Sequence, residues 1–314
     1  MCETACDVGW SPALFRLAQG ACEAAPREVL LSVSTAVEVG VGYEALCSLW
    51  HQQHSALVRK AAHGHRERVP EYVAAWEGGE SLAGIAARVG FSPVLLARLV
   101  VEAFLGVAKK DVGELVRRPE GIPNARLRAE VEACAAADAH CGPRSDAARR
   151  DVGVEYELVL RSLLERSGIP FEHEDDLRRR GFSKTPDVHL LVPLGFLRGG
   201  PPRPDAPRPR LKIVNWVDSK AMFGSPQAYA TEVRHQLLAY VNRLGAGAVV
   251  FWFGFADELQ DLDDDVLLLN DWPPAGALFW PDATPVLPPP NEAQSPGQRT
   301  IDAYFPPRPS PPAG

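Results

Sequence analysis

Two short motifs carry carboxylates and a lysine of the kind that hydrolyse phosphodiester bonds. Asp187 follows a proline directly before an apolar stretch, and Asp218 and Lys220 stand two residues apart at the end of a later one. Alternate residues of a strand share a face, so Asp218 and Lys220 should project together while Ser219 points away. Glu157 lies upstream in an amphipathic stretch. Glu157, Asp187, Asp218 and Lys220 therefore form a candidate catalytic cluster.

These side-chain types fit magnesium-dependent chemistry. Mg²⁺, or Mn²⁺ in its place, prefers oxygen ligands and commonly takes one or two protein carboxylates with waters and substrate phosphate. We expect Asp187, Asp218 and the carbonyl of Ser219 to hold the ion, and Glu157 to bind it directly or through water. The ion would polarise the phosphoryl group and lower the pKa of a bound water from about 16 toward neutrality. Lys220 would position the nucleophile or neutralise the transition state.

A small α/β unit is expected to position the cluster. The apolar spacing predicts two helices and three strands in the order helix, strand, strand, helix, strand. Their ranges are 147–168, 188–192, 211–220, 227–244 and 248–255. This order predicts an α/β core around a mixed sheet. The first helix carries both Glu155 and Glu157, on different faces, so either could serve the metal. The Pro-rich stretch 195–210 is predicted to be an exposed loop.

At this point a family resemblance becomes specific. Pro186-Asp187 followed by Asp218-Ser219-Lys220 resembles the signature of the PD-(D/E)xK nuclease superfamily. The stretches 184–187, 216–224 and 240–245 resemble one branch of it, the TPD-type family of codanin-interacting nucleases. The resemblance implies a restriction-endonuclease-like sheet flanked by helices, DNA hydrolysis with Mg²⁺, and a codanin-like partner. It covers about residues 145–270, and the Pro-rich insertion lengthens the usual spacing between the two motifs.

The resemblance also assigns a role to Gln236 and Tyr240. The two residues are one helical turn apart and share a face. They are similar to the Gln-xxx-Tyr element of RecB-like nucleases, which lines the DNA side of the active site. The alternative is a polar residue and an aromatic residue on an ordinary amphipathic helix.

The N-terminal part, residues 1–145, reads as a helical domain. Between residues 81 and 105, Gly90 is expected to end one helix, and Ser92 and Pro93 to begin the next. Two helices joined by such a turn form a helix-turn-helix, which often places its second helix in the major groove. Arg98 is the DNA-contacting candidate on that helix. The alternative is a helical hairpin that only packs.

The bulk composition narrows the class of protein. The net charge is −7 and the sequence pI is about 5.7, so nonspecific coating of nucleic acid is not expected. Basic patches can still bind phosphates, and Arg180 and Lys184 lie in one beside Asp187. The six cysteines form no Cys-x-x-Cys pair, which argues against a disulfide framework or a common zinc site. Without a signal sequence or apolar span, we expect an intracellular protein with no membrane association.

The nuclease domain is predicted to span residues 146–281, and a disordered Pro-rich tail residues 282–314. Within the tail, residues 298–305 resemble the peptide by which replication and repair proteins bind the sliding clamp PCNA. One short helical turn would place Ile301, Tyr304 and Phe305 on an apolar face, with Gln298 in a neighbouring polar site. The alternative is a tail that folds back onto the nuclease domain. Clamp binding predicts a nuclear protein, also present in the cytoplasm.

The sequence thus predicts a metal-dependent DNA nuclease, structure-dependent in its substrate and linked to replication or repair through PCNA. A nuclease-like fold that serves as an adaptor with little turnover is the alternative. A third hypothesis is a DNA-binding regulator that acts through residues 1–145 alone.

Overall fold

The computed structural model describes residues 9–24, 40–198, 210–260, 262–274, 276–282 and 284–286. They form a helical unit within residues 13–153 and a sheet unit that combines residues 9–12 with residues from 154 onward. The boundary falls inside helix α9 (Pro143–Arg166), eight residues after the predicted boundary at 145/146. This shift has a simple cause, because the buried residues of α9 begin at Tyr156 and its first part is polar.

The helical unit contains helices of 8 to 25 residues, and residues from α4 to α8 form one apolar core. The elements are α1 (Pro12–Ala24), α3 (Tyr43–Glu67), α4 (Val69–Glu77), α5 (Leu82–Val89), α6 (Pro93–Leu105), α7 (Lys109–Arg117), the 3₁₀ turn η1 (Pro119–Gly121) and α8 (Ala125–Ala137). Among the described residues, no single helix is long and apolar enough to cross a membrane. The bent pair α5 and α6 passes that test only when taken together, and the apolar residues of both helices are buried in the unit's core.

The predicted pair of helices forms with the expected turn. The Ser81 hydroxyl accepts the N–H of Gly84 at 3.0 Å at the start of α5, and Gly90 ends it with φ of 63°. The Ser92 hydroxyl accepts the N–H of Leu95 at 3.2 Å, and Pro93 begins α6. The axes of α5 and α6 are bent by 119°. The local capping residues therefore determine where both helices begin and end.

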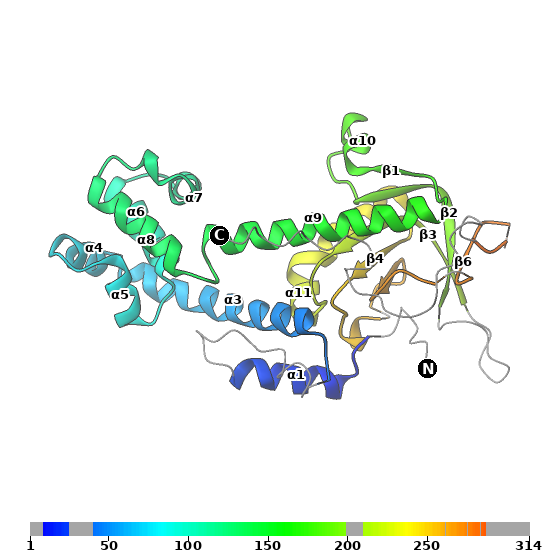
Figure 1. Ribbon diagram of the computed structural model, residues 1–314, viewed down its shortest axis with the longest axis horizontal. Coiled ribbons are helices and arrows are strands. Elements are labelled where there is room, and N and C mark those ends of the chain that lie inside the picture. Colours follow the sequence, from blue (N-terminus) through cyan, green and yellow to red (C-terminus); the bar gives the residue numbers. More distant parts are fainter. Residues whose placement is uncertain are drawn as a thin grey trace, which may run out of the picture. The chain divides into compact units, whose positions relative to one another are not determined.

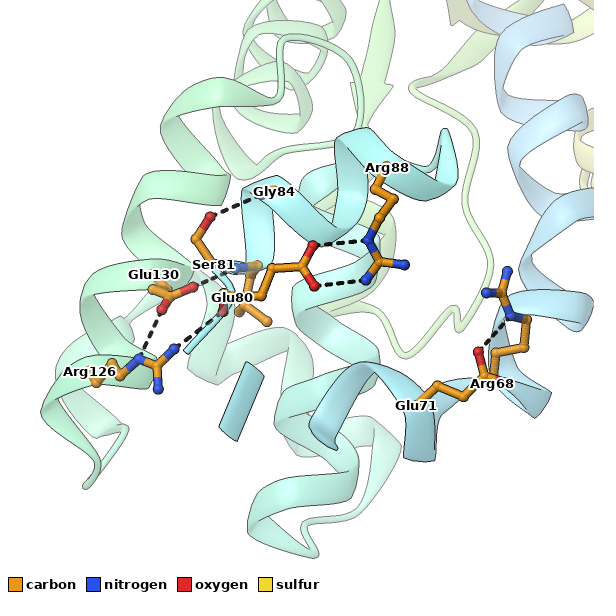
Figure 2. Close-up of polar contacts among 9 residues, drawn as sticks. Arg68, Glu71, Glu80, Ser81, Gly84, Arg88, Arg126 and Glu130 are labelled. Carbon is orange, nitrogen blue, oxygen red and sulfur yellow. Dashed lines mark hydrogen bonds and ion pairs between the residues drawn. The ribbon is translucent and has the colours of Figure 1, made fainter. Parts of the chain in front are cut away.

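Side chains from two neighbouring segments hold α5 in place (Figure 2). The Glu130 carboxylate on α8 accepts the backbone N–H of Leu82 at 2.5 Å and is paired with Arg126 at 3.2 Å. The Glu80 carboxylate accepts two hydrogen bonds from Arg88, at 3.0 and 2.8 Å. An acidic group at a helix N-terminus satisfies an unpaired N–H and complements the helix dipole.

Helix α6 is the central helix of this unit. It packs against α4, α5, α7 and α8. Five of its residues are buried, and Ala103 is exposed. Arg98 is half-buried, near Gly113 of α7. The second helix of the predicted helix-turn-helix thus serves first as a core helix, and contact between Arg98 and DNA stays a prediction.

The sheet unit contains a mixed six-stranded sheet. Its strands are β1 (Phe171–His173), β2 (Val188–Arg198), β3 (Arg210–Lys220), β4 (Gly247–Phe251), β5 (Val266–Leu269) and β6 (Leu278–Phe279). They lie in the order β1-β2-β3-β4-β5, and β6 pairs with β2. The pairs β1·β2, β2·β3 and β2·β6 are antiparallel, and β3·β4 and β4·β5 are parallel. The predicted α/β class with a mixed sheet is confirmed.

Helices cover both faces of this sheet (Figure 1). Leu160 and Leu164 of α9 pack on one face with residues of β2, β3 and β4. On the other face lie α11 (Pro226–Ala228), the π-helical turn η2 (Tyr229–Val233) and α12 (Arg234–Leu244). The helix predicted over 227–244 is therefore present, with a π-helical segment at Tyr229–Val233. Helix α10 (Glu174–Arg179) follows β1, and the 3₁₀ turn η3 (Asp257–Leu259) follows β4.

The prediction of a loop over residues 195–210 is wrong at both ends. Residues 195–198 continue β2 and pair with residues 210–213 of β3. Phe196 is 2% exposed, and its burial in the sheet core outweighs the local turn signals. The register shifts between His189 and Leu194, which accommodates Pro193 without a ladder hydrogen bond. Residues 199–209 lie outside the described residues.

Two domain limits also differ from the sequence prediction. Trp10, placed by the sequence in the helical domain, bridges to Ala256 and packs on Phe223 at 4.3 Å between ring centroids, so it belongs to the sheet unit. At the other end, Val286 is 3% exposed in the sheet core and Pro285 bridges to Phe279. The folded unit thus extends beyond residue 282, because apolar side chains there find room against the sheet.

Candidate active site

The end of strand β3 carries the centre of the candidate site. Asp218 is 1% exposed, and its Oδ2 lies 2.5 Å from Nζ of Lys220. Both side chains project from the same face of the strand, as the alternation of strand residues predicts. Ser219 points the other way, where its hydroxyl accepts the indole N–H of Trp252 at 2.8 Å. Strand β4 runs parallel beside this segment and buries it.

Asp187 joins this centre from the start of β2. Its Oδ2 accepts the backbone N–H of Ser219 at 2.7 Å, which ties the two strands together. Burial and the charge of Asp218 raise the pKa of Asp187 well above its usual value, although Lys220 and the Ser219 N–H oppose the rise. Burial alone would lower the pKa of Lys220, but Asp218 and Asp187 outweigh it and the pKa is raised. The charges of the two strands are therefore strongly coupled.

Glu157 of α9 faces the same cluster. Burial raises its pKa; the charge of Arg161 opposes this rise, while Glu174 and Asp218 add to it. Glu157 in turn affects the pKa values of Asp187 and Lys220. The structure thus places Glu157 toward the cluster, which the sequence alone left open between two glutamates.

Gln236 and Tyr240 approach the cluster from α12. Nε2 of Gln236 donates to the Tyr240 hydroxyl at 2.5 Å, so the two residues share a helix face as expected. Tyr240 is 2% exposed and lies edge-on to Trp216 at 5.3 Å between ring centroids. Burial raises the pKa of Tyr240, and the charges of Asp218 and Asp187 add to this effect. The Tyr240 hydroxyl is therefore a neutral hydrogen-bonding group beside the carboxylates.

Glu174, at the start of α10, is a further acidic residue near the cluster that the sequence did not reveal. It affects the pKa values of Glu157 and Tyr240. Its Oε1 accepts the hydroxyl hydrogen of buried Thr185 at 3.1 Å, two residues before Asp187. The His173-Glu174-Asp175-Asp176 run looks like the acidic first turn of a helix, which gives no signal for a site.

The three basic residues predicted to contact DNA differ in their partners, their exposure and the unit in which they lie. Nη1 of Arg180 is held by Glu172 at 2.7 Å, and its guanidinium lies over Phe182. Lys184 is exposed just before Thr185 and Pro186. Arg98 lies in the other unit. The clamp-binding residues Gln298, Ile301, Tyr304 and Phe305 lie outside the described residues.

The donor set can be tested for its fit to a metal ion. In the part of the chain that the structure describes, no three His, Cys, Asp or Glu side chains are already grouped around a common point. Magnesium needs fewer protein ligands than that, because it keeps several waters. Asp218 is suited to a cation: apart from the Lys220 ion pair, neither of its buried oxygens has a hydrogen-bond donor among the described residues. Asp187 and Asp218 together fit an ion with hard oxygen ligands.

Comparison with known proteins identifies a family and several relatives to which this chain is similar. Residues 123–272 match the family described as "Protein of unknown function TPD sequence-motif". "CDAN1-interacting nuclease 1" of Xenopus tropicalis is 32% identical over 241 residues, which cover 72% of this chain and 75% of the relative. The human protein of that name is 31% identical over 230 residues, covering 68% and 77%. The Danio rerio protein is 36% identical over 196 residues, covering 60% and 61%.

No solved structure matches the chain. The family match contains every residue of the candidate site, from Glu157 to Tyr240. The similarity covers about three quarters of the length of the amphibian and human relatives. The chain belongs to the CDAN1-interacting nuclease family.

Proposed function

We propose that this protein is a metal-dependent nuclease that hydrolyses phosphodiester bonds in DNA. The observation that carries the proposal is the state of Asp218. Its carboxylate is almost fully buried and lacks hydrogen-bond donors among the described residues, save for the paired Lys220. A buried carboxylate is normally hydrogen-bonded, paired or bound to a metal. With Asp187 and Glu157 beside it, Asp218 lies in a cluster suited to a divalent cation, and relatives of the chain are named as nucleases.

In this proposal Asp187, Asp218 and the Ser219 carbonyl hold Mg²⁺ or Mn²⁺, and Glu157 binds it directly or through water. When bound, the ion would lower the pKa of a water molecule and polarise the phosphoryl group. The N–H of Ser219 fixes the orientation of Asp187, so one carboxylate oxygen is held in place before substrate arrives. Such preorganisation lowers the cost of reaching the transition state.

Lys220 and the Gln236–Tyr240 pair act on the reacting groups themselves. Lys220 keeps its proton because Asp218 and Asp187 stabilise its charge, so its ammonium group can donate to the attacking water or to a phosphoryl oxygen. The Tyr240 hydroxyl also keeps its proton and accepts from Gln236, which leaves its O–H free to donate toward the substrate. These groups orient the substrate beside the carboxylates.

The element order supports a restriction-endonuclease-like fold of the PD-(D/E)xK superfamily. Helix α9 is followed by β1, the short helix α10, β2 and β3, then by α11, η2, α12 and β4. In this order Glu157 comes from the first helix, Asp187 from the start of β2, and Asp218 and Lys220 from the end of β3. This order is the one that the superfamily signature implies, and it supports the proposed roles of these residues.

The proposal includes DNA contacts outside the cluster. Exposed Lys184 precedes the Asp187 motif, where a phosphate contact would position the substrate. Arg180 would have to exchange Glu172 for a phosphate. In the helical unit, the helix-turn-helix and Arg98 would add a second DNA contact. Because five residues of α6 are buried, only the ends of this helix would contact bases.

Thr185→Val is expected to slow DNA cleavage about tenfold, because the Thr185 hydroxyl bonded to Glu174 holds the chain just before Asp187. The substitution keeps the side-chain shape and should cost only about 1 kcal/mol of stability. Single-turnover cleavage and urea unfolding measure the two effects. Thr231→Val is the matched control, since Thr231 is exposed and bonds only its own helix. Equal rates for both variants would contradict the positioning role of Thr185.

We also propose a codanin-like protein as a partner, on the ground that relatives of this chain are named as CDAN1-interacting. Co-purification of the two full-length proteins tests this pairing. We expect the partner to bind outside the catalytic cluster, so the Asp187→Ala variant should bind it as the wild type does. Loss of binding in that variant alone would link the surface to the site.

The C-terminal motif leads to a second proposed partner, PCNA, and with it a nuclear location and a role in replication or repair. A peptide of residues 295–309 is expected to bind PCNA with a micromolar Kd, about −8 kcal/mol. Ile301, Tyr304 and Phe305 would fill an apolar pocket, and Gln298 a polar one. Isothermal titration with the peptide measures the affinity. Undiminished binding by the peptide with Tyr304→Ala and Phe305→Ala would exclude this mode.

The function itself is tested with a panel of labelled substrates: single strand, duplex, flap, fork and Holliday junction. Cleavage of at least one DNA substrate is expected with Mg²⁺ or Mn²⁺, and none with EDTA. Selective cleavage of flaps, forks or junctions would support structure dependence. Binding of DNA and partners without cleavage of any substrate would instead support the adaptor, and cleavage that persists in EDTA would exclude the metal-dependent mechanism.

A further inference from the structure

Helix α9 carries a half-buried basic residue close to the cluster, Arg161. It follows Glu157 by four residues, so the two side chains lie on the same side of the helix. Within the described residues, the Nε atom of Arg161 is buried and has no hydrogen-bond acceptor. A guanidinium always keeps its charge, and burying an unpaired donor of a charged group is costly. Such a group in a folded protein calls for a ligand that completes it.

Three neighbouring arginines differ from Arg161, because each is already paired with an acidic residue. Arg178 pairs with Glu174 at 2.5 Å, Arg179 pairs with Asp176, and Arg180 pairs with Glu172 at 2.7 Å. All three side chains are more than half exposed and already have acidic partners. Arg161 is less exposed, yet its Nε hydrogen is unused. An anion that reached this Nε–H would therefore displace no acceptor among the described residues.

The electrostatics of the site favour a further cation that binds the anionic backbone. When no metal ion is bound, Glu157, Asp187 and Asp218 outnumber Lys220 in charge and repel a phosphodiester backbone. Arg161 lies one helical turn from Glu157 on α9, so its charge lies close to the cluster. Guanidinium groups bind phosphate oxygens through two parallel N–H groups, often including Nε. Arg161 thus has the charge and the free donor that a phosphate requires, one helical turn from a cluster residue.

We propose that Arg161 binds a backbone phosphate of the DNA next to the cleavage site, and so fixes the register of the strand against the cluster. This inference rests on the proposed nuclease function and names a residue that binds its substrate. The phosphate would accept the Nε hydrogen that lacks an acceptor in the described residues. Arg161 would be a binding residue and not a ligand of the metal, because it carries only donors.

The test measures DNA affinity without cleavage. The full-length Asp187→Asn protein, in EDTA, is titrated with a short fluorescein-labelled DNA duplex at several salt concentrations. Adding Arg161→Gln is expected to weaken binding about tenfold and to reduce the salt dependence by about one released counterion. Arg161→Lys should restore the salt dependence but not the full affinity, because lysine lacks the second donor of the fork.

Arg150→Gln serves as the matched control, since Arg150 is exposed on the same helix. If Arg150→Gln weakened DNA binding as much as Arg161→Gln, the effect would come from net charge alone, and the proposed site would be overturned. Unchanged affinity and salt dependence in Arg161→Gln would overturn it as well, even where Asp187→Ala abolishes cleavage and upholds the nuclease. Absence of DNA binding in the Asp187→Asn protein would overturn the Arg161 site, while the nuclease proposal is tested separately by cleavage of the substrate panel in Mg²⁺ or Mn²⁺.

Discussion

Asp218→Asn is expected to reduce DNA cleavage by roughly a thousandfold, about 4 kcal/mol in transition-state stabilisation. The substitution keeps the size of the side chain but removes the charge that a divalent cation needs. Among the described residues Asp218 is paired only with Lys220, so the substitution breaks one ion pair and no wider hydrogen-bond network. Loss of activity should therefore exceed loss of structure. Single-turnover cleavage under Mn²⁺ measures the first, and circular dichroism the second.

Metal binding separates this explanation from a simple disturbance of the fold. Titration calorimetry should find Mn²⁺ binding in the wild type and greatly weakened binding in Asp218→Asn. Asp175→Asn makes the same chemical change on exposed helix α10 and should leave both cleavage and Mn²⁺ binding unchanged. Full activity in Asp218→Asn would show that the assigned site is wrong. Lost activity with intact Mn²⁺ binding would move Asp218 from metal binding to another catalytic role.

The parts of this site that local sequence rules determine were predictable. Asp218 and Lys220 share a face because a strand repeats every two residues, whatever the sheet around it. Gln236 and Tyr240 meet because a helix repeats after about four residues. The capping residues Ser92 and Gly90 place the ends of two helices in the same way. In each case the spacing in the chain is enough to fix the geometry.

The parts that depend on tertiary packing were not predictable. The choice between Glu155 and Glu157 depends on which face of α9 meets the sheet, and only the packed structure supplies that. Strand β1 is three residues long with charged Glu172 at its centre, so it carries no hydrophobic alternation that would reveal it. Trp10 reaches Ala256 through a contact between distant parts of the chain. Pairing over such separations leaves no periodic signal in either segment.

The position of Tyr240 depends on a glycine that holds no functional group. Gly247, the first residue of β4, lies against the indole ring of Trp216, and a Cβ at this position would overlap that ring. The indole N–H donates to the Gly245 carbonyl at 2.8 Å, which fixes the ring flat against the turn before β4. The other side of the indole meets the edge of Tyr240. Glycine therefore allows the close approach that seats Trp216 two residues before Asp218.

Gly247→Ala is expected to destabilise the sheet unit by about 3 kcal/mol or more, because the indole is fully buried and cannot move without opening the core. For a unit of this size, that loss lowers Tm by about 10 °C. Gly153→Ala is the control: nothing lies within 4 Å of its added Cβ, and in helix α9 it should stabilise by about 0.5–1 kcal/mol. Thermal unfolding followed by circular dichroism measures both variants. An unchanged Tm in Gly247→Ala would mean that Trp216 has room to rotate, and Tyr240 would then owe its position to α12 alone.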